Sequence, residues 1–128
     1  MSTKYVLDAW AWIEYLDGSS TGKKVSNKIK EGNTYTNVVT LAEVISKVDR
    51  KQRDTAVAFR AITSKSKIIT VDEEFARDAG LLHSSVKRLR PNFSFGDAFT
   101  LHTAKNMSAK VLTGDSDFEG MKEAEMLH

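Results

Sequence analysis

Short apolar runs, each preceded by a lysine and followed by an aspartate, recur at residues 4–8, 67–72 and 110–115. Continuous apolar runs of this length are typical of strands that are buried on both faces, as in parallel sheets. Residues 34–39 form a fourth candidate strand, and residues 125–127 form a short fifth. We therefore expect a central sheet of four to five strands.

Between these runs, apolar residues recur at helical spacing. Leu41, Val44, Ile45 and Val48 stand at positions i, i+3, i+4 and i+7, which places them on one face of a helix. Helices are expected at residues 10–16, 23–30, 41–48, 57–62, 75–86 and 97–105. Strands that alternate with helices predict an α/β fold, in which helices cover both faces of a mainly parallel sheet.

The length and the turn content narrow this prediction. The chain has 128 residues, one proline and no linker-like tract. Because domains usually have about 100–150 residues, we expect residues 1–128 to form a single domain. The scarcity of proline and of turn clusters argues against an all-β sandwich, which needs frequent turns.

The charges nearly balance, since 19 lysines and arginines against 17 acids leave a net charge of +2. This balance excludes a strongly basic tail and an acidic disordered segment. The absence of cysteine excludes a disulfide scaffold, a thiolate zinc site and a thiol nucleophile. No run approaches the ~20 apolar residues of a membrane span, and the N-terminus lacks the apolar segment of a signal peptide. We therefore expect a cytoplasmic protein with no membrane partner.

Carboxylates stand close to the ends of the predicted strands, where α/β sheets bind their ligands. Asp8 follows the first strand directly, Asp115 follows a later one, and Asp117 lies two residues further along. Glu43 lies in the first turn of one predicted helix, and Asp97 begins another. Because the carboxyl ends of parallel strands share one edge of the sheet, these acids could converge there.

Each of these acids also has a purely structural explanation. Thr40 and Glu43 have the spacing of a capping box, and Ser94 and Asp97 form a looser version of it. Asp8 could cap the helix that follows it. Taken singly, the acids are therefore explained by helix capping, and only their combination points to a shared site.

A shared acidic site requires a counter-charge. Two carboxylates ~4 Å apart repel each other by roughly 4 kcal/mol at an effective dielectric constant of ~20. A divalent cation would offset that repulsion, and an all-oxygen ligand set selects the hard ions Mg²⁺ and Mn²⁺. Oxygen-ligated metal ions serve phosphodiester cleavage, because they activate water and stabilise the leaving oxygen.

Four motifs occur along nearly the whole chain in a recognisable order: Asp8, Thr40-x-x-Glu43, Ser94-x-x-Asp97-Ala98 and Thr113-Gly114-Asp115-Ser116-Asp117-Phe118. Together they resemble the PIN domain, and the compact length is similar to that of the VapC-type toxins of toxin–antitoxin pairs. The last motif is the strongest single piece of the resemblance. The chain departs from the pattern at Ala9, where many relatives have serine or threonine.

The resemblance implies a three-layer α/β/α sandwich and a Mg²⁺- or Mn²⁺-dependent endoribonuclease that hydrolyses RNA phosphodiester bonds. It also implies a homodimer that is silenced by an antitoxin covering the site. The residues that correspond to the family's acidic quartet are Asp8, Glu43, Asp97 and Asp115, with Asp117 as a frequent fifth acid of the metal site and Thr113 as a supporting hydroxyl. In this scheme, the metal is ligated directly by Asp8, Asp97 and Asp115. Glu43 either shares a metal or orients the attacking water.

The basic segments 47–53 and 87–90 are candidates for holding an RNA backbone, although basic helix faces are commonly just solvated. Trp10, Trp12 and Tyr15 could stack on bases, whereas their helical spacing favours packing in a core or a dimer interface.

Other functions stay open. A phosphatase of the haloacid-dehalogenase type would use Asp8 as nucleophile, but it would need a second acid at the position of Trp10. An RNA-processing PIN nuclease outside a toxin–antitoxin system would have the same sequence features. A non-catalytic scaffold that binds RNA or a protein partner would keep the acids only as helix caps.

Overall fold

The structure is a computed structural model that describes residues 3–127. Within that range the strands are β1 (Tyr5–Leu7), β2 (Thr34–Asn37), β3 (Lys67–Ile69), β4 (Lys110–Thr113) and β5 (Ala124–Met126). The helices are α1 (Ala9–Asp17), α2 (Ser20–Lys30), α3 (Val38–Arg50), α4 (Thr55–Lys65), α5 (Glu73–Lys87) and α6 (Phe95–Met107), with a 3₁₀ turn, η1 (Ser116–Phe118), after β4.

The strands form one parallel sheet in the order β3-β2-β1-β4-β5. β1 lies at its centre, where Tyr5 aligns with Thr34 of β2 and Leu7 aligns with Leu112 of β4. The chain first adds strands on one side of β1 and then returns to add β4 and β5 on the other side. This reversal opens a crevice at the carboxyl ends of β1 and β4, where α/β sheets bind ligands.

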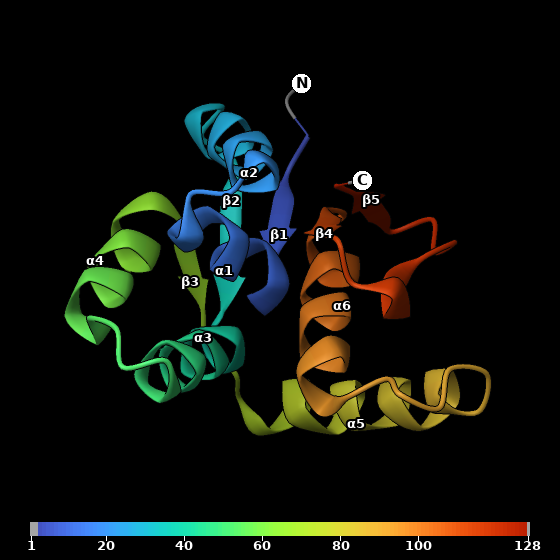
Figure 1. Cartoon of the computed structure of the whole chain (residues 1–128). Helices are drawn as coiled ribbons and strands as arrows, with labels where there is room; N and C mark the ends of the chain where they lie inside the picture. The colour runs from blue at the N-terminus through green and yellow to red at the C-terminus, as the bar shows by residue number, and fades with distance from the viewer. Residues whose placement is uncertain (1–2, 128) are drawn as a thin grey trace.

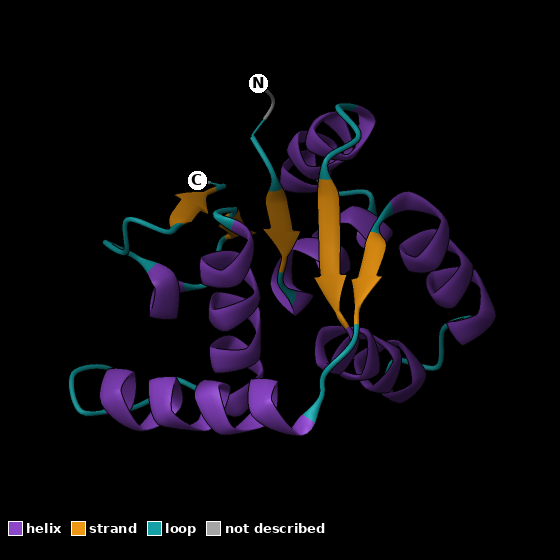
Figure 2. Cartoon of the chain, turned by 180° about the vertical axis from the view of Figure 1, so that it is seen from behind, coloured by secondary structure: helices purple, strands orange, loops and turns teal. Residues whose placement is uncertain are grey.

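Helices cover both faces of the sheet (Figure 1). Neighbouring residues of β1 point to opposite faces: Leu7 packs with Trp12 of α1 and Val44 of α3, whereas Val6 packs with Leu101 of α6. Helices α1 to α4 therefore share one core, and α5 and α6 share the other. Seen from behind, α6 stands upright along the sheet and α5 crosses its lower end (Figure 2). The predicted three-layer α/β/α sandwich is confirmed.

The boundary between β2 and α3 lies earlier than the sequence pattern predicts. β2 ends at Asn37 rather than at Val39, because the Asn37 side chain accepts a hydrogen bond from the Val39 backbone N–H (2.8 Å) and caps α3. Thr40 consequently lies inside the helix, fully buried, with its hydroxyl 3.2 Å from that of Thr100 on α6. The prediction that Thr40 caps this helix is therefore wrong, and Glu43 lies in the second turn.

The other elements lie close to their predicted places. The three lysine-to-aspartate runs contain β1, β3 and β4, and the 75–86 and 97–105 patterns lie within α5 and α6. β5 begins one residue before its predicted start. Among residues 3–127, the structure has no helix with both the length and the apolar character that crossing a membrane requires.

Candidate functional site

Five carboxylates line one pocket of about 210 Å³ at the carboxyl ends of β1 and β4. They are Asp8 after β1, Glu43 on α3, Asp97 on α6, and Asp115 and Asp117 around η1. These segments lie far apart in the sequence, and the strand order brings them together. All five acids that the sequence pattern selects therefore share one pocket.

Asp97, Asp115 and Asp117 form a compact trio within this pocket. Each offers one carboxylate oxygen, and the three oxygens all lie within 4.8 Å of one another. Three carboxylate oxygens at this separation could hold one divalent cation of the kind that prefers oxygen ligands. Asp8 and Glu43 line the same pocket outside the trio.

Asp8 is the most deeply buried acid of the pocket, with 5% of its surface exposed. Its Oδ1 accepts a hydrogen bond from the Ala11 backbone N–H (2.8 Å) and so caps α1, and its Oδ2 accepts one from the Thr113 hydroxyl. Burial raises the pKa of Asp8 from 3.8 to about 7; the two hydrogen bonds oppose this shift, and the charges of Asp115 and Asp97 add to it.

Thr113 connects two acids of the pocket. Its buried hydroxyl donates to Asp8 and accepts a hydrogen bond from the Asp115 backbone N–H (2.9 Å). Asp115 Oδ1 in turn accepts from the Asp117 backbone N–H (2.9 Å). The residues that follow β4 are thus held in place by hydrogen bonds that begin at Asp8.

Asp97 combines helix capping with a place in the pocket. Its backbone N–H donates to the Ser94 hydroxyl, and its Oδ2 accepts from the Ser94 backbone N–H, both at 3.0 Å, so the predicted capping box is confirmed. The cap uses Oδ2 alone and leaves Oδ1 without a hydrogen bond from residues 3–127. Burial raises the pKa of Asp97, and Asp115 and Asp117 raise it further, against the hydrogen bonds with Ser94.

Glu43 reaches the pocket because α3 lies against the N-terminal turn of α6. The absence of a side chain at Gly96 permits this approach, since a Cβ there would collide with the Glu43 carboxylate. Burial raises the pKa of Glu43, and the charge of Asp97 adds to the increase, whereas Lys47 lowers it. Glu43 thus forms the wall of the pocket next to Asp97.

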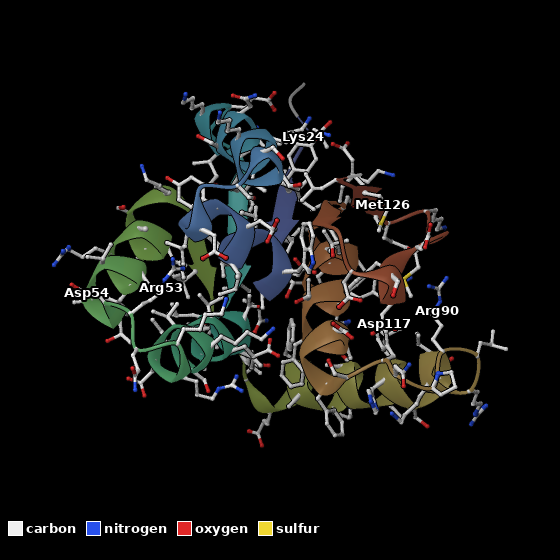
Figure 3. The ribbon with its side chains drawn as sticks, viewed as in Figure 1. Lys24, Arg53, Asp54, Arg90, Asp117 and Met126 are labelled. Atoms are coloured by element: carbon white, nitrogen blue, oxygen red, sulfur yellow. The ribbon has the colours of Figure 1, made fainter. Side chains whose placement is uncertain are left out.

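Arg90 holds η1 in position beside the pocket. Its Nη1 donates to the backbone carbonyl of Asp117 (2.8 Å), and Figure 3 shows the two residues facing each other. Burial and the charge of Asp115 raise the pKa of Asp117, whereas Arg90 and Lys87 lower it. The arginine therefore both positions Asp117 and reduces its charge repulsion.

The pKa values of Asp8, Glu43, Asp97 and Asp117 are all raised, with burial as the main cause. Bringing these groups together as carboxylates is unfavourable unless a cation compensates for their charge. The described lining of the pocket contains carboxylate, hydroxyl and amide oxygens and no histidine. This donor set fits Mg²⁺ or Mn²⁺ better than a softer metal.

Several lining residues do not follow from the sequence pattern. Asn92, Gly96 and Thr100 line the pocket beside the acids. Trp10 and Lys47 also line it; the tryptophan packs partly against the core, as its helical spacing predicts, and the lysine is exposed. The only sequence signal for Gly96 is its place within the Ser94 capping box, and that signal does not reveal its contact with α3.

Comparisons with known proteins extend these observations. Residues 5–124 match the family model of the PIN domain. No curated protein matches the chain by sequence. The DNA-bound VapBC complex of Salmonella typhimurium has a TM-score of 0.75 at 16% identity, over 99% of this chain and 100% of that one.

Two structures from Mycobacterium tuberculosis are similar as well. VapC20, a sarcin–ricin loop cleaving toxin, has a TM-score of 0.73 at 14% identity, over 94% of this chain and 96% of its own. VapBC-5 has a TM-score of 0.63 at 22% identity, over 98% of both chains. At such low identity these likenesses concern the fold. The family model, however, matches nearly the whole length, and the chain belongs to the PIN domain family.

Proposed function

We propose that this protein is a metal-dependent endoribonuclease that hydrolyses RNA phosphodiester bonds. The observation that carries the proposal is the convergence of five acids from separate segments on one small pocket, in a chain of the PIN domain family. Helix capping explains the positions of Asp8 and Asp97 but not why they meet Glu43 and Asp115. A cation that draws in RNA phosphate gives this convergence a function.

In this proposal, Asp97, Asp115 and Asp117 hold Mg²⁺ or Mn²⁺, because their oxygens lie within 4.8 Å of one another. Asp97 would use Oδ1, since Oδ2 remains in the capping box. Asp8 would complete the ligand set once it loses its proton, and the Thr113 hydroxyl joins its carboxylate to the Asp115 backbone N–H through hydrogen bonds.

Glu43 is the residue that we assign to the attacking water. Its carboxylate borders Asp97 and lacks the capping bond that occupies Asp97, and burial raises its pKa, which makes it a better proton acceptor than an exposed glutamate. When bound, the metal ion lowers the pKa of a ligated water and stabilises the leaving oxygen. Glu43 then orients the water for in-line attack on phosphorus, or shares the metal.

The test is incubation of the purified protein with labelled RNA in Mn²⁺ and in EDTA. We expect cleavage only with Mn²⁺, and a loss of at least about a hundredfold in Asp8→Asn and Asp97→Asn. Asp72→Asn is the matched control, because Asp72 caps α5 outside the pocket and asparagine caps helices as well as aspartate does. Cleavage in EDTA, or undiminished cleavage by Asp97→Asn, would assign the activity to another site or to a contaminant.

We further propose that the chain is the cytoplasmic toxin of a toxin–antitoxin pair, a homodimer whose site an antitoxin protein covers. The support is the presence of toxin–antitoxin complexes among the similar solved structures, including one from Klebsiella pneumoniae. Induced expression should stop bacterial growth, and Asp97→Asn should remove the effect. Light scattering after gel filtration tests the dimer. Normal growth despite active enzyme would favour an RNA-processing nuclease.

A further inference from the structure

A second hollow, of about 430 Å³, adjoins the acidic pocket. We call it the α1–α3 groove, and its lining residues are Trp10, Ile13 and Glu14 of α1, Lys47 and Arg50 of α3, and Lys51 at the C-terminal end of α3. Trp10 and Lys47 line both hollows, so the groove lies directly beside the acidic pocket.

Along one face of α3, the side chain inside the pocket is acidic, and the side chains beyond the pocket are basic. Lys47 and Arg50 follow Glu43 at intervals of four and seven residues, which places the three side chains on one side of the helix. With a rise of 1.5 Å per residue, Lys47 stands about 6 Å beyond Glu43 along the axis, and Arg50 about 4.5 Å further. A polyanion that leaves the pocket along α3 therefore meets positive charge at once.

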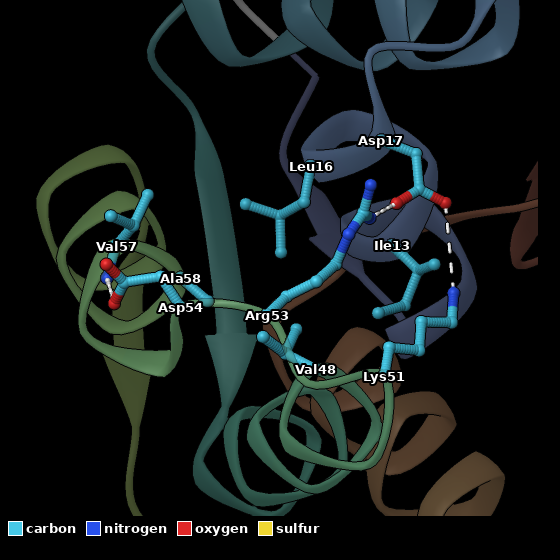
Figure 4. Close-up of a pocket in the computed structure, with 9 residues that line it drawn as sticks. All are labelled: Ile13, Leu16, Asp17, Val48, Lys51, Arg53, Asp54, Val57 and Ala58. Carbon is cyan, nitrogen blue, oxygen red and sulfur yellow. Dashed lines mark hydrogen bonds and ion pairs between the residues drawn. The ribbon is translucent and has the colours of Figure 1, made fainter.

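The basic side chains near the groove differ in whether they already form ion pairs within the protein. In a neighbouring pocket, which shares Ile13 and Lys51 with the groove, Arg53 forms an ion pair with Asp17. Lys51 Nζ lies 3.9 Å from the same carboxylate (Figure 4). Arg50 uses only its Nε, in a bond to a carbonyl of its own helix. Lys47 has no ion pair among residues 3–127 and is exposed.

Trp10 stands at the junction of the two hollows in a fixed position. Its six-membered ring lies against the backbone of Gly114, where a Cβ would collide with it. Gly114 immediately precedes Asp115, so the indole is held beside the acidic trio while remaining partly exposed. A flat, immobilised indole next to basic side chains is the combination that binds unpaired bases by stacking and their backbone by charge.

We propose that the α1–α3 groove binds the stretch of single-stranded RNA that adjoins the scissile phosphate. One unpaired base stacks on Trp10, and the neighbouring phosphates bind Lys47 and Arg50. This assignment rests on the proposed function, because the acidic pocket supplies the cleavage. Single-stranded RNA fits the groove better than a duplex does, since a paired base does not offer its face to the indole.

Binding of a fluorescein-labelled single-stranded RNA, measured by anisotropy at several salt concentrations, tests the basic side of the groove. The measurements use the Asp8→Asn background in Mg²⁺, so that the RNA stays intact. Lys47→Gln/Arg50→Gln should weaken binding about tenfold. It should also reduce the slope of log K against log salt by about 1.4, because each phosphate contact on a single strand contributes about 0.7.

The matched control is Lys23→Gln/Lys30→Gln on α2. It removes the same charge from exposed positions on a helix that lies at the other end of the strands (Figure 1). The control should leave both affinity and slope nearly unchanged. If the groove and control variants lose equal amounts of RNA affinity, net charge alone explains the loss, and the groove assignment is wrong.

Trp10 is tested in the otherwise unmodified protein through the cleavage kinetics. Trp10→Leu should raise KM about tenfold for single-stranded RNA, whereas Trp10→Phe, which keeps a stacking ring, should stay within about threefold. The melting temperatures of both variants show whether the fold has survived. Equal KM values for the two variants, both near that of the parent, would remove the stacking role.

The outcomes separate this inference from the function on which it rests. If the parent protein cleaves RNA while Lys47→Gln/Arg50→Gln keeps its affinity and salt slope, the groove is not the RNA track and the nuclease proposal stands. If the parent protein cleaves no RNA in Mn²⁺, the nuclease proposal is wrong, and the groove assignment, which rests on it, is wrong as well.

Discussion

At the scale of single residues, Asp8 links the fold to the chemistry. It caps α1 through one carboxylate oxygen and accepts a hydrogen bond from Thr113 with the other, while it lies among further acids. A helix cap is normally exposed and easily ionised, whereas burial raises the pKa of this one to about 7. Loss of its proton therefore has a cost in the metal-free protein.

This cost predicts how the free energy of unfolding depends on pH. Because the pKa of Asp8 is higher in the folded than in the unfolded state, the folded protein binds more protons between about pH 4 and pH 7. Stability in EDTA should consequently fall as the pH rises through that window. Asp8→Asn should remove this contribution and add about 1–3 kcal/mol at pH 8, with no gain at pH 4.

Urea unfolding of both proteins at the two pH values provides the measurement. Asp72→Asn again serves as control, since it makes the same substitution at an exposed helix cap outside the pocket. An equal loss of stability in Asp8→Asn at both pH values would show that capping outweighs the burial of charge.

Thr113 makes a second prediction at this scale. In Thr113→Val the Asp8 carboxylate loses a hydrogen-bond donor and the Asp115 backbone N–H loses its acceptor. We expect a loss of about 1–3 kcal/mol in the free energy of unfolding, together with weaker Mn²⁺ binding measured by calorimetry. Thr113→Ser keeps the hydroxyl and should retain Mn²⁺ affinity; a serine variant as weak as the valine variant would point to packing instead.

At the scale of elements, the junction of α3 and α6 decides where Glu43 lies. The buried threonine pair joins the two helices, and Gly96 leaves space for the glutamate. The Ser94 capping box sets the direction in which α6 begins. The site thus depends on a close approach between two helices that are distant in the sequence.

Gly96→Ala tests this junction. The added methyl group must displace the Glu43 carboxylate, and a displacement of 1 Å can cost about a hundredfold in rate. Cleavage should therefore fall by about that factor. Stability should change by less than about 1 kcal/mol, because alanine is the better helix former. Gly80→Ala, in open space on α5, is the control; equal rates in the two variants would show that the position of Glu43 is unimportant.

At the scale of the whole molecule, the small net charge of +2 conceals a separation of charges. Five of the 17 acidic residues line one pocket, and lysine and arginine side chains line the adjoining α1–α3 groove. The near balance of the composition therefore gives no sign of an acidic site beside a largely basic groove. This arrangement suits an enzyme that must bring a cation and a polyanion together.

Metal binding should stabilise the entire fold. A ligand that binds only the folded state adds about 2.7 kcal/mol at a concentration of 100 times its Kd. Mn²⁺ should raise the melting temperature of the parent protein, and the increase should disappear in Asp97→Asn but persist in Asp72→Asn. Equal increases in the parent and Asp97→Asn would place the metal elsewhere.

The local pattern predicted much of this architecture. Apolar runs marked the strands, helical spacing marked the helices, and Ser94 with Asp97 marked a true cap. Local signals failed where two of them overlapped. Either Asn37 or Thr40 could cap the N-terminus of α3, and in the structure Asn37 is the capping residue. The acids of the pocket could also be selected from the sequence, because each one lies near the end of a strand or in the first two turns of a helix.

The sequence by itself determined which elements form and which acids lie near the end of a strand or in the first turns of a helix, since both depend on neighbours a few residues apart. Only the tertiary structure decided that α3 touches α6 at Gly96, that Trp10 lines the pocket as well as packing against the core, and that Lys47 lines both the pocket and the groove. The reason is physical: these contacts depend on strand order and on how closely two helices pack. No spacing along the chain encodes either property.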